Sequence, residues 1–420
     1  MRRALLPFLL LLAHSSLFAL EFFPPAPDSH TGVRVKFLAV NCAPVVHVAV
    51  SGSTITLSST QLPGTGCIDT FFPAPAAADV GVLAPGIYDV QGEAGEQGKL
   101  IVRDAGAGII VSPVGISTTI TPRLIRTVQI FSDRPLASPV SVLFDGIPAT
   151  IEPTTTKGST HYVVVTPPPH EAGTVEVTLT DGQATRKAIA AFTYFDPEAQ
   201  PDPALFEPVL YPVAYNGPGV LGSQWRTENG VGTGADTIIR FRAVEKVEAC
   251  NAVCGQFNWS ALFSRQSQAG ALIWMVRRRI PAGTDLEDEL RLSSRIIEFS
   301  HPDDVNTTLP VARENDFKQS FAIEHVPLNN ESRVTLRLYV LADSRRTAVV
   351  LVDRGGEVIP QVMDLTPING VAFGMLAIAP SALNPQRAPL TLTIRSSEKV
   401  WGLVTVTDNL TQRVTAFWPQ

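Results

Sequence analysis

Short stretches of alternating or continuous apolar residues, separated by Gly and Pro, run along most of this chain. Early examples are Val33–Val40, Val45–Ser51 and Ser53–Ser58, which are rich in β-branched residues. No run of ten or more residues places apolar side chains at helical spacing without a Pro or Gly inside it. This pattern predicts an all-β protein, with tandem immunoglobulin-like β-sandwiches followed by a larger C-terminal β-sandwich region.

Six or seven short strand patterns fall within residues 21–104, which is enough for a small N-terminal β-sandwich. In Ala84–Val90 a Pro-Gly turn leads into a strand whose Tyr88 can pack at the edge of the sandwich. Asp104–Gly108 follows as a linker. The sequence therefore predicts one complete module before residue 108.

The clearest pattern lies in residues 108–197. Apolar and polar residues alternate along Val175–Thr180, which predicts a strand with one buried and one solvated face. Asp145-Gly146 and Asp181-Gly182 are turn dipeptides, and Pro167–Pro169 cannot donate to a β-ladder and so end a strand. This segment predicts a second β-sandwich.

The second sandwich resembles the IPT/TIG domain family, whose fold is immunoglobulin-like. The resemblance rests on Ser112-Pro113, Val142–Ala149, Val163–Pro168, Ala172–Gly182 and Phe192–Tyr194. The Gly-rich opening of family members is matched only loosely by Ile110–Gly115. The resemblance implies a binding or spacer module of a secreted bacterial protein, of the kind found in surface receptors and in some polysaccharide-acting enzymes.

Residues 205–420 follow the Pro-rich linker Glu198–Pro208 and contain about a dozen strand patterns. They suit one large sandwich or two stacked smaller ones. The strand candidates are Val209–Tyr215, Thr237–Arg242, Ala271–Arg277, Glu289–Phe299, Ser320–His325, Val334–Ala342, Ala348–Val352, Leu390–Arg395, Val400–Val406 and Arg413–Trp418. This region also resembles the C-terminal region of uncharacterised secreted bacterial proteins that carry TIG-like modules. The resemblance rests on Asn216–Glu228, the Cys250–Cys254 loop, Pro310–Phe317 and Thr407–Thr415.

Residues 1–20 have the pattern of a secretory signal peptide. Arg2 and Arg3 precede the short apolar run Leu5–Ala13, and Ala19 offers a small residue for cleavage. The apolar run is too short to span a bilayer, although a non-cleaved anchor is the alternative. We expect a secreted or extracytoplasmic protein, in the periplasm or at the cell surface, with no integral membrane segment after signal cleavage.

Charge and cysteine content narrow the possible partners. Of the 420 residues, 17% are charged and the net charge is −6, so no basic field exists to hold nucleic acid. Four cysteines in an exported chain predict disulfides, with Cys42–Cys67 and Cys250–Cys254 favoured by position. Free thiols and a metal site at the second pair remain alternatives, and no metal or other cofactor is expected.

No catalytic motif stands out. The chain has no His-Glu-x-x-His, no Gly-x-Ser-x-Gly and no Gly-rich phosphate loop. His301 and His325 with Asp303 and Asp304 could supply metal ligands, but no spacing fixes them together. The basic run Arg277–Arg279 is explained by a strand end that faces acidic groups.

Trp225 and Trp259 are the candidate binding residues. Each neighbours a Gly-rich or Cys-closed loop, where an exposed ring could stack on a sugar. The competing interpretation is that the tryptophans pack in the sandwich cores. The other tryptophans of the chain are Trp274, Trp401 and Trp418.

The sequence therefore predicts a non-catalytic protein for cell-surface or extracellular recognition, adhesion or scaffolding. Its partner would be an unidentified protein or glycan ligand. The alternative is a glycan-binding or glycan-hydrolysing protein whose site lies in the C-terminal region.

Overall fold

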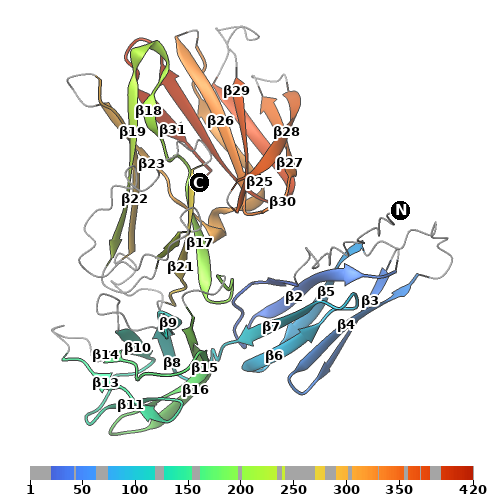
Figure 1. Cartoon of the computed structure of the whole chain (residues 1–420), viewed down its shortest axis with the longest axis vertical. Helices are drawn as coiled ribbons and strands as arrows, with labels where there is room; N and C mark the ends of the chain where they lie inside the picture. The colour runs from blue at the N-terminus through green and yellow to red at the C-terminus, as the bar shows by residue number, and fades with distance from the viewer. Residues whose placement is uncertain are drawn as a thin grey trace, which may run out of the picture.

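The computed structural model confirms the all-β prediction (Figure 1). The residues that the structure describes are 20–41, 44–62, 74–118, 127–153, 161–196, 201–233, 239–241, 270–279, 290–300, 305–329, 331–353, 358–368, 370–378 and 389–419. Within these ranges, helical structure is limited to single 3₁₀ turns, η1 (Val220–Gly222) and η3 (Glu314–Asp316). Residues 1–19 of the predicted signal peptide, Trp259 and all four cysteines lie outside the described residues.

Two sheets form the N-terminal module. One has the order β1-β2-β5 and the other β3-β4-β6-β7. The strands are β1 Glu21–Phe23, β2 Gly32–Ala39, β3 Pro44–Ser51, β4 Thr54–Gln61, β5 Ala74–Val82, β6 Gly86–Gln91 and β7 Gln97–Val102. Tyr88 packs in this core, as the sequence predicts, and its hydroxyl also donates to the Ala84 carbonyl at 3.0 Å.

Two further sheets form the central module. Their orders are β13-β14-β10-β8 and β12-β11-β15-β16-β9. The strands are β8 Ile109–Ser112, β9 Gly115–Ser117, β10 Val128–Ser132, β11 Ser141–Phe144, β12 Ile147–Pro148, β13 Thr150–Ile151, β14 Tyr162–Thr166, β15 Gly173–Thr180 and β16 Thr185–Phe195. The core between the sheets is rich in valine and contains an edge-to-face pair of Phe144 and Phe192.

The turn residues of the central module act as their sequence predicts. Asp145 (φ 49°) and Gly146 (φ 79°) both adopt the left-handed conformation that a two-residue hairpin turn between β11 and β12 requires. β14 ends immediately before Pro167. The apolar residues of β15 are buried, as the alternating pattern predicts. Thr178, which points to the other face, is buried as well.

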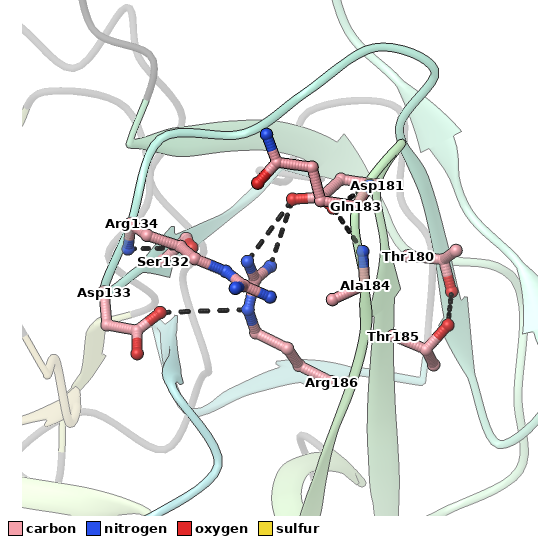
Figure 2. Close-up of polar contacts among 9 residues, drawn as sticks. All are labelled: Ser132, Asp133, Arg134, Thr180, Asp181, Gln183, Ala184, Thr185 and Arg186. Atoms are coloured by element: carbon pink, nitrogen blue, oxygen red, sulfur yellow. Dashed lines mark hydrogen bonds and ion pairs between the residues drawn. The ribbon is translucent and has the colours of Figure 1, made fainter.

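Asp181 organises the second turn (Figure 2). Its carboxylate accepts the backbone N–H groups of Gln183 and Ala184, both at 2.9 Å, and two nitrogens of Arg186 at 3.3 Å. These backbone hydrogen bonds, helped by Arg186, hold the pKa of Asp181 below its ordinary value. The turn dipeptide is thus part of a buried polar network.

The C-terminal region contains two sheet systems. The first combines the sheet β20-β21-β17-β24 with the sheet β18-β19-β22-β23. Their bounds are β17 Phe206–Tyr211, β18 Asn216–Pro218, β19 Gln224–Thr233, β20 Ile239–Phe241, β21 Ala271–Val276, β22 Leu290–Glu298, β23 Val305–Leu309 and β24 Ala312–Arg313. This system adjoins the central module.

The second system is a seven-stranded sheet that closes on itself, because β30 pairs with β25 and β27 along its first half and with β26 and β31 along its second. Its strands are β25 Lys318–Val326, β26 Ser332–Val340, β27 Arg346–Asp353, β28 Val358–Ile368, β29 Val371–Ile378, β30 Leu390–Asp408 and β31 Val414–Phe417. The two strands predicted at Leu390–Arg395 and Val400–Val406 are therefore one long strand.

A shared apolar cluster joins the two C-terminal sheet systems. Leu210 and Leu272 of the first pack with Tyr339 and Trp401 of the second, and the Tyr339 hydroxyl donates to the Pro212 carbonyl. Burial raises the pKa of Tyr339, so this phenol stays protonated as a donor. Among the described residues, no helix is long and apolar enough to cross a membrane.

Candidate functional site

Trp225, the candidate sugar-stacking residue, lies at the start of β19. Only 8% of the residue is exposed, and its indole Nε1 donates to the Ser223 hydroxyl at 2.8 Å. A Cβ on Gly219 would lie 2.4 Å from that nitrogen, so the loop backbone rests directly on the ring. Trp225 therefore packs beneath the loop and offers no open ring face, and its role in glycan binding remains a prediction.

The loop above Trp225 exposes two apolar side chains instead. Val220 and Leu221 form the 3₁₀ turn between β18 and β19, and Leu221 is 72% exposed. Leu221 has φ 57°, a left-handed conformation that is strained for a leucine. The Tyr215 hydroxyl donates to the Pro218 carbonyl at 2.6 Å and braces the base of the loop.

Phe299 provides the exposed aromatic ring at the same end of the sheet. Its backbone N–H donates to the Gln224 carbonyl at 3.0 Å, which places it beside the base of the loop, and 43% of the residue is exposed. The Arg226 guanidinium lies 5.8 Å from the ring centroid, within cation–π range. We call the β18–β19 loop (Gly219–Ser223) together with Arg226 and Phe299 the loop end.

The polar groups beside the loop end are mostly committed to the fold. Glu298 is fully buried and its carboxylate accepts the backbone N–H of Gln224 at 2.8 Å and that of Ser300 at 3.0 Å. Arg226 also pairs with Glu228 at 2.9 Å. Glu298 therefore ties β19 to β22, and the loop end presents an apolar and aromatic surface flanked by one guanidinium.

Sequence reasoning missed Leu221 and Phe299. It selected the tryptophan, the largest aromatic near the Gly-rich turn, but the loop folds back over that ring. The available signal was the pair Gly219 and Gly222, which brackets two apolar residues in a short turn. Of the other tryptophans, Trp401 is buried in the C-terminal core and Trp418 is partly exposed.

The basic run Arg277–Arg279 does face acidic groups, as expected. Arg277 pairs with Glu314 at 2.7 Å, and Arg279 pairs with Asp28 at 3.7 Å. His325 is exposed and approaches only Glu324 among the described carboxylates. No group of three or more metal-ligating side chains gathers within the described residues.

Arg103 lies at the point where the three modules meet. It follows β7, and its backbone N–H and carbonyl bond to the Pro27 carbonyl (3.1 Å) and to the Ser29 N–H (2.8 Å). Its Nη1 donates to the Ala190 carbonyl of the central module at 2.9 Å. Nη2 has no hydrogen-bond partner in the described part of the chain. Burial, reinforced by the Arg279 and Arg277 guanidiniums, lowers the pKa of Arg103 to about 9.

Every pair of modules makes a direct polar contact at this junction. Arg103 joins the N-terminal and central modules, the Val114 N–H donates to the Arg277 carbonyl at 3.0 Å, and Asp28 pairs with Arg279. A small apolar cluster joins Ile101 of the N-terminal module, Ala190 of the central module and Ala204 of the second linker. Figure 1 shows the modules converging near β7, β16 and β17. The linkers therefore join modules that are bonded to one another.

Comparison with known proteins gives no family for the chain. No family model matches it, and no curated protein matches it in sequence. Among solved structures, it overlaps with SGBP-B of the mixed-linkage glucan utilization locus of Bacteroides ovatus, in complex with a mixed-linkage heptasaccharide, at 12% identity over 93% of this chain and 100% of that chain, with a TM-score of 0.23.

A second overlap is with SGBP-B from a complex xyloglucan utilization locus in Bacteroides uniformis. The identity is 9% over 96% of both chains, and the TM-score is 0.16. At these TM-scores the overlaps do not establish a common fold.

Proposed function

We propose that this chain is a non-enzymatic recognition protein of the cell exterior that binds a glycan at the loop end. The observation that carries the proposal is the exposure of Leu221, in a strained backbone conformation, at the same end of the sheet as the exposed residue Phe299. Strained residues persist where the surrounding structure holds them and tend to cluster at binding sites. Grouped exposed apolar side chains likewise mark interaction surfaces.

The chemistry of the loop end suits a sugar better than a charged ligand. Apolar and aromatic side chains can pack against the C–H face of a sugar ring, as stacking platforms do for other flat ligands. Arg226 retains donors that can reach hydroxyl groups, although it also pairs with Glu228. The buried Glu298 uses its Oε1 atom to hold β19 and Ser300, which fits a structural role better than acid–base catalysis.

Binding of the full chain to an array of soluble and insoluble glycans tests this proposal. Leu221→Ala and Phe299→Ala should each weaken binding at least about tenfold, the scale of losing one buried apolar contact. Val362→Ala is the matched control, because Val362 is also 72% exposed but lies on β28 of the closed sheet. It should bind as the unaltered chain does.

Three outcomes would contradict the proposal. Binding that survives both loop-end substitutions would place the ligand elsewhere. Release of sugar fragments from any glycan would show turnover and an enzymatic function. Failure to bind any glycan, combined with saturable binding of a protein that Leu221→Ala abolishes, would keep the loop end as the site but change the class of ligand.

A further inference from the structure

β3 is an unprotected edge strand. Within the described part of the chain it pairs only with β4, in an uninterrupted register from Pro44↔Gln61 to Ser51↔Thr54. An edge strand leaves a row of backbone N–H and C=O groups without a ladder partner on its outer side. β3 therefore offers a template for one further strand.

The sequence of β3 carries none of the usual protection. Pro44–Ser51 contains no Lys, Arg, Asp or Glu, and its only proline is its first residue. Val45 and Val50 are exposed, Val50 to 48%. Natural edge strands commonly carry charges, internal prolines or bulges that block pairing with another chain.

Two other edge strands of the same molecule do carry such protection. β5 has Pro75 and Asp79 within it and a bulge opposite Val33 and Arg34. β25, at an edge of the closed sheet, has Lys318 and Glu324 and two register shifts. β8 (Ile109–Ser112) and β23 (Val305–Leu309) also lie at edges without such protection, but β3, with eight residues, is the longest unprotected edge among the described strands.

We propose that β3 pairs antiparallel with β3 of a second copy of this chain, about a two-fold axis perpendicular to the sheet. The sheet β3-β4-β6-β7 of each copy then continues into that of its partner. Homodimers with this symmetry use the same patch on both copies, so the patch must complement itself. A strand without charged side chains meets no like-charge repulsion when it faces its own copy.

The pleat restricts the register. Under this symmetry, inner-face residues must oppose inner-face residues, since a one-residue slip would exchange the two faces. Placing Val48 opposite Val48 sets Val46 beside Val50 and covers the exposed part of Val50. It also leaves Pro44, which has no N–H, outside the ladder. Other in-phase registers exist, such as the one that sets His47 against His47 and brings Pro44 into the ladder opposite Val50.

The β3 edge lies away from the junction between the modules, and β5 of the opposite sheet packs beside β3. β3 and β7 form opposite edges of their sheet, and β7 leads directly into Arg103 at the junction. A copy that docks on β3 therefore approaches the edge of this sheet away from the contacts that hold the modules together. Dimerisation would bring two loop ends into one particle, which increases avidity for a repetitive ligand.

Sedimentation of the full chain over a range of concentrations tests the proposal. The unaltered chain should reversibly dimerise, and Val50→Lys should raise the dimer Kd at least about tenfold, because it places a charge at each end of the new ladder. Val82→Lys is the control in the same module, since Val82 is also exposed but lies on β5. Circular dichroism and the thermal midpoint check that both variants fold.

A peptide with the sequence of residues 44–51 provides an independent readout, because it should dissociate the dimer by occupying β3. A monomeric chain at all concentrations, or a dimer that persists in Val50→Lys, would overturn the proposal. A monomeric chain that binds the peptide would assign this edge to an extended segment of another protein. None of these results depends on glycan binding, so this inference and the proposed function fail separately.

Discussion

At the scale of single residues, Asp181 both forms a turn that the sequence predicts and carries a buried negative charge that stabilises this turn. The side chain of Asp181 is fully buried, as is most of that of Arg186, and the carboxylate accepts two backbone N–H groups and the guanidinium. Such hydrogen bonds stabilise the ionised carboxylate. The sequence predicted the turn from Asp181-Gly182, but the partner five residues later becomes visible only in the folded hairpin.

This arrangement predicts a pH-dependent contribution to stability. The pKa of Asp181 is lowered on folding, so its contribution is complete above the ordinary aspartate pKa of about 4 and is lost as the pH falls below it. Asp181→Asn should therefore be less stable than the unaltered chain at pH 7, and the difference should shrink at acid pH. Urea denaturation of both proteins from pH 7 to pH 3 measures the effect.

Asp133→Asn supplies the control for this prediction. Asp133 lies 3.8 Å from the same guanidinium, but its side chain is 64% exposed. Water screens such a pair, so we expect a much smaller loss of stability. An equal loss in both variants would show that the backbone hydrogen bonds to Asp181 contribute little.

At the scale of elements, two turns of the central module require glycine for different reasons. At one glycine a side chain would clash with its neighbours, and at the other the backbone conformation disfavours any side chain. A Cβ on Gly182 would lie 2.7 Å from the Ser138 carbonyl oxygen, whereas Gly146 has open space but φ 79°. Gly182→Ala should cost about 1–3 kcal/mol because backbone must move, and Gly146→Ala about 1 kcal/mol from strain alone. Denaturation midpoints of the two variants measure the order, and a larger loss in Gly146→Ala would contradict it.

The sequence predicted turns and amphipathic strands well, because these depend on local chemistry. Strand β28 was missed because Pro360 and Pro367 lie within it. Among the described residues, β28 pairs with β27 alone at Pro360 and meets β29 from Thr366 onward, so the missing N–H of Pro360 is accommodated on one side of the strand. Likewise, the burial of Trp225 under its own loop depends on long-range packing that residue spacing does not encode.

At the scale of the whole molecule, the junction determines whether the three modules move together. Sequence composition predicted linkers at Asp104–Gly108 and Glu198–Pro208, and linkers alone suggest independent modules. The contacts of Arg103, Val114 and Asp28 instead bind each module to the other two. Residues that form this junction come from distant parts of the chain, so no local pattern could reveal it.

Arg103→Ala should loosen the arrangement of the modules. The substitution leaves the Ala190 carbonyl without its donor and opens a space between modules, at a cost of about 1–3 kcal/mol. We expect a larger radius of gyration in solution X-ray scattering and faster proteolysis within residues 104–108. Arg34→Ala, which removes a surface arginine paired with Asp79, should change neither. If the scattering of Arg103→Ala is unaltered while its stability falls, Arg103 stabilises the modules without fixing their arrangement, and the remaining contacts of Arg277 and Arg279 must hold the modules together.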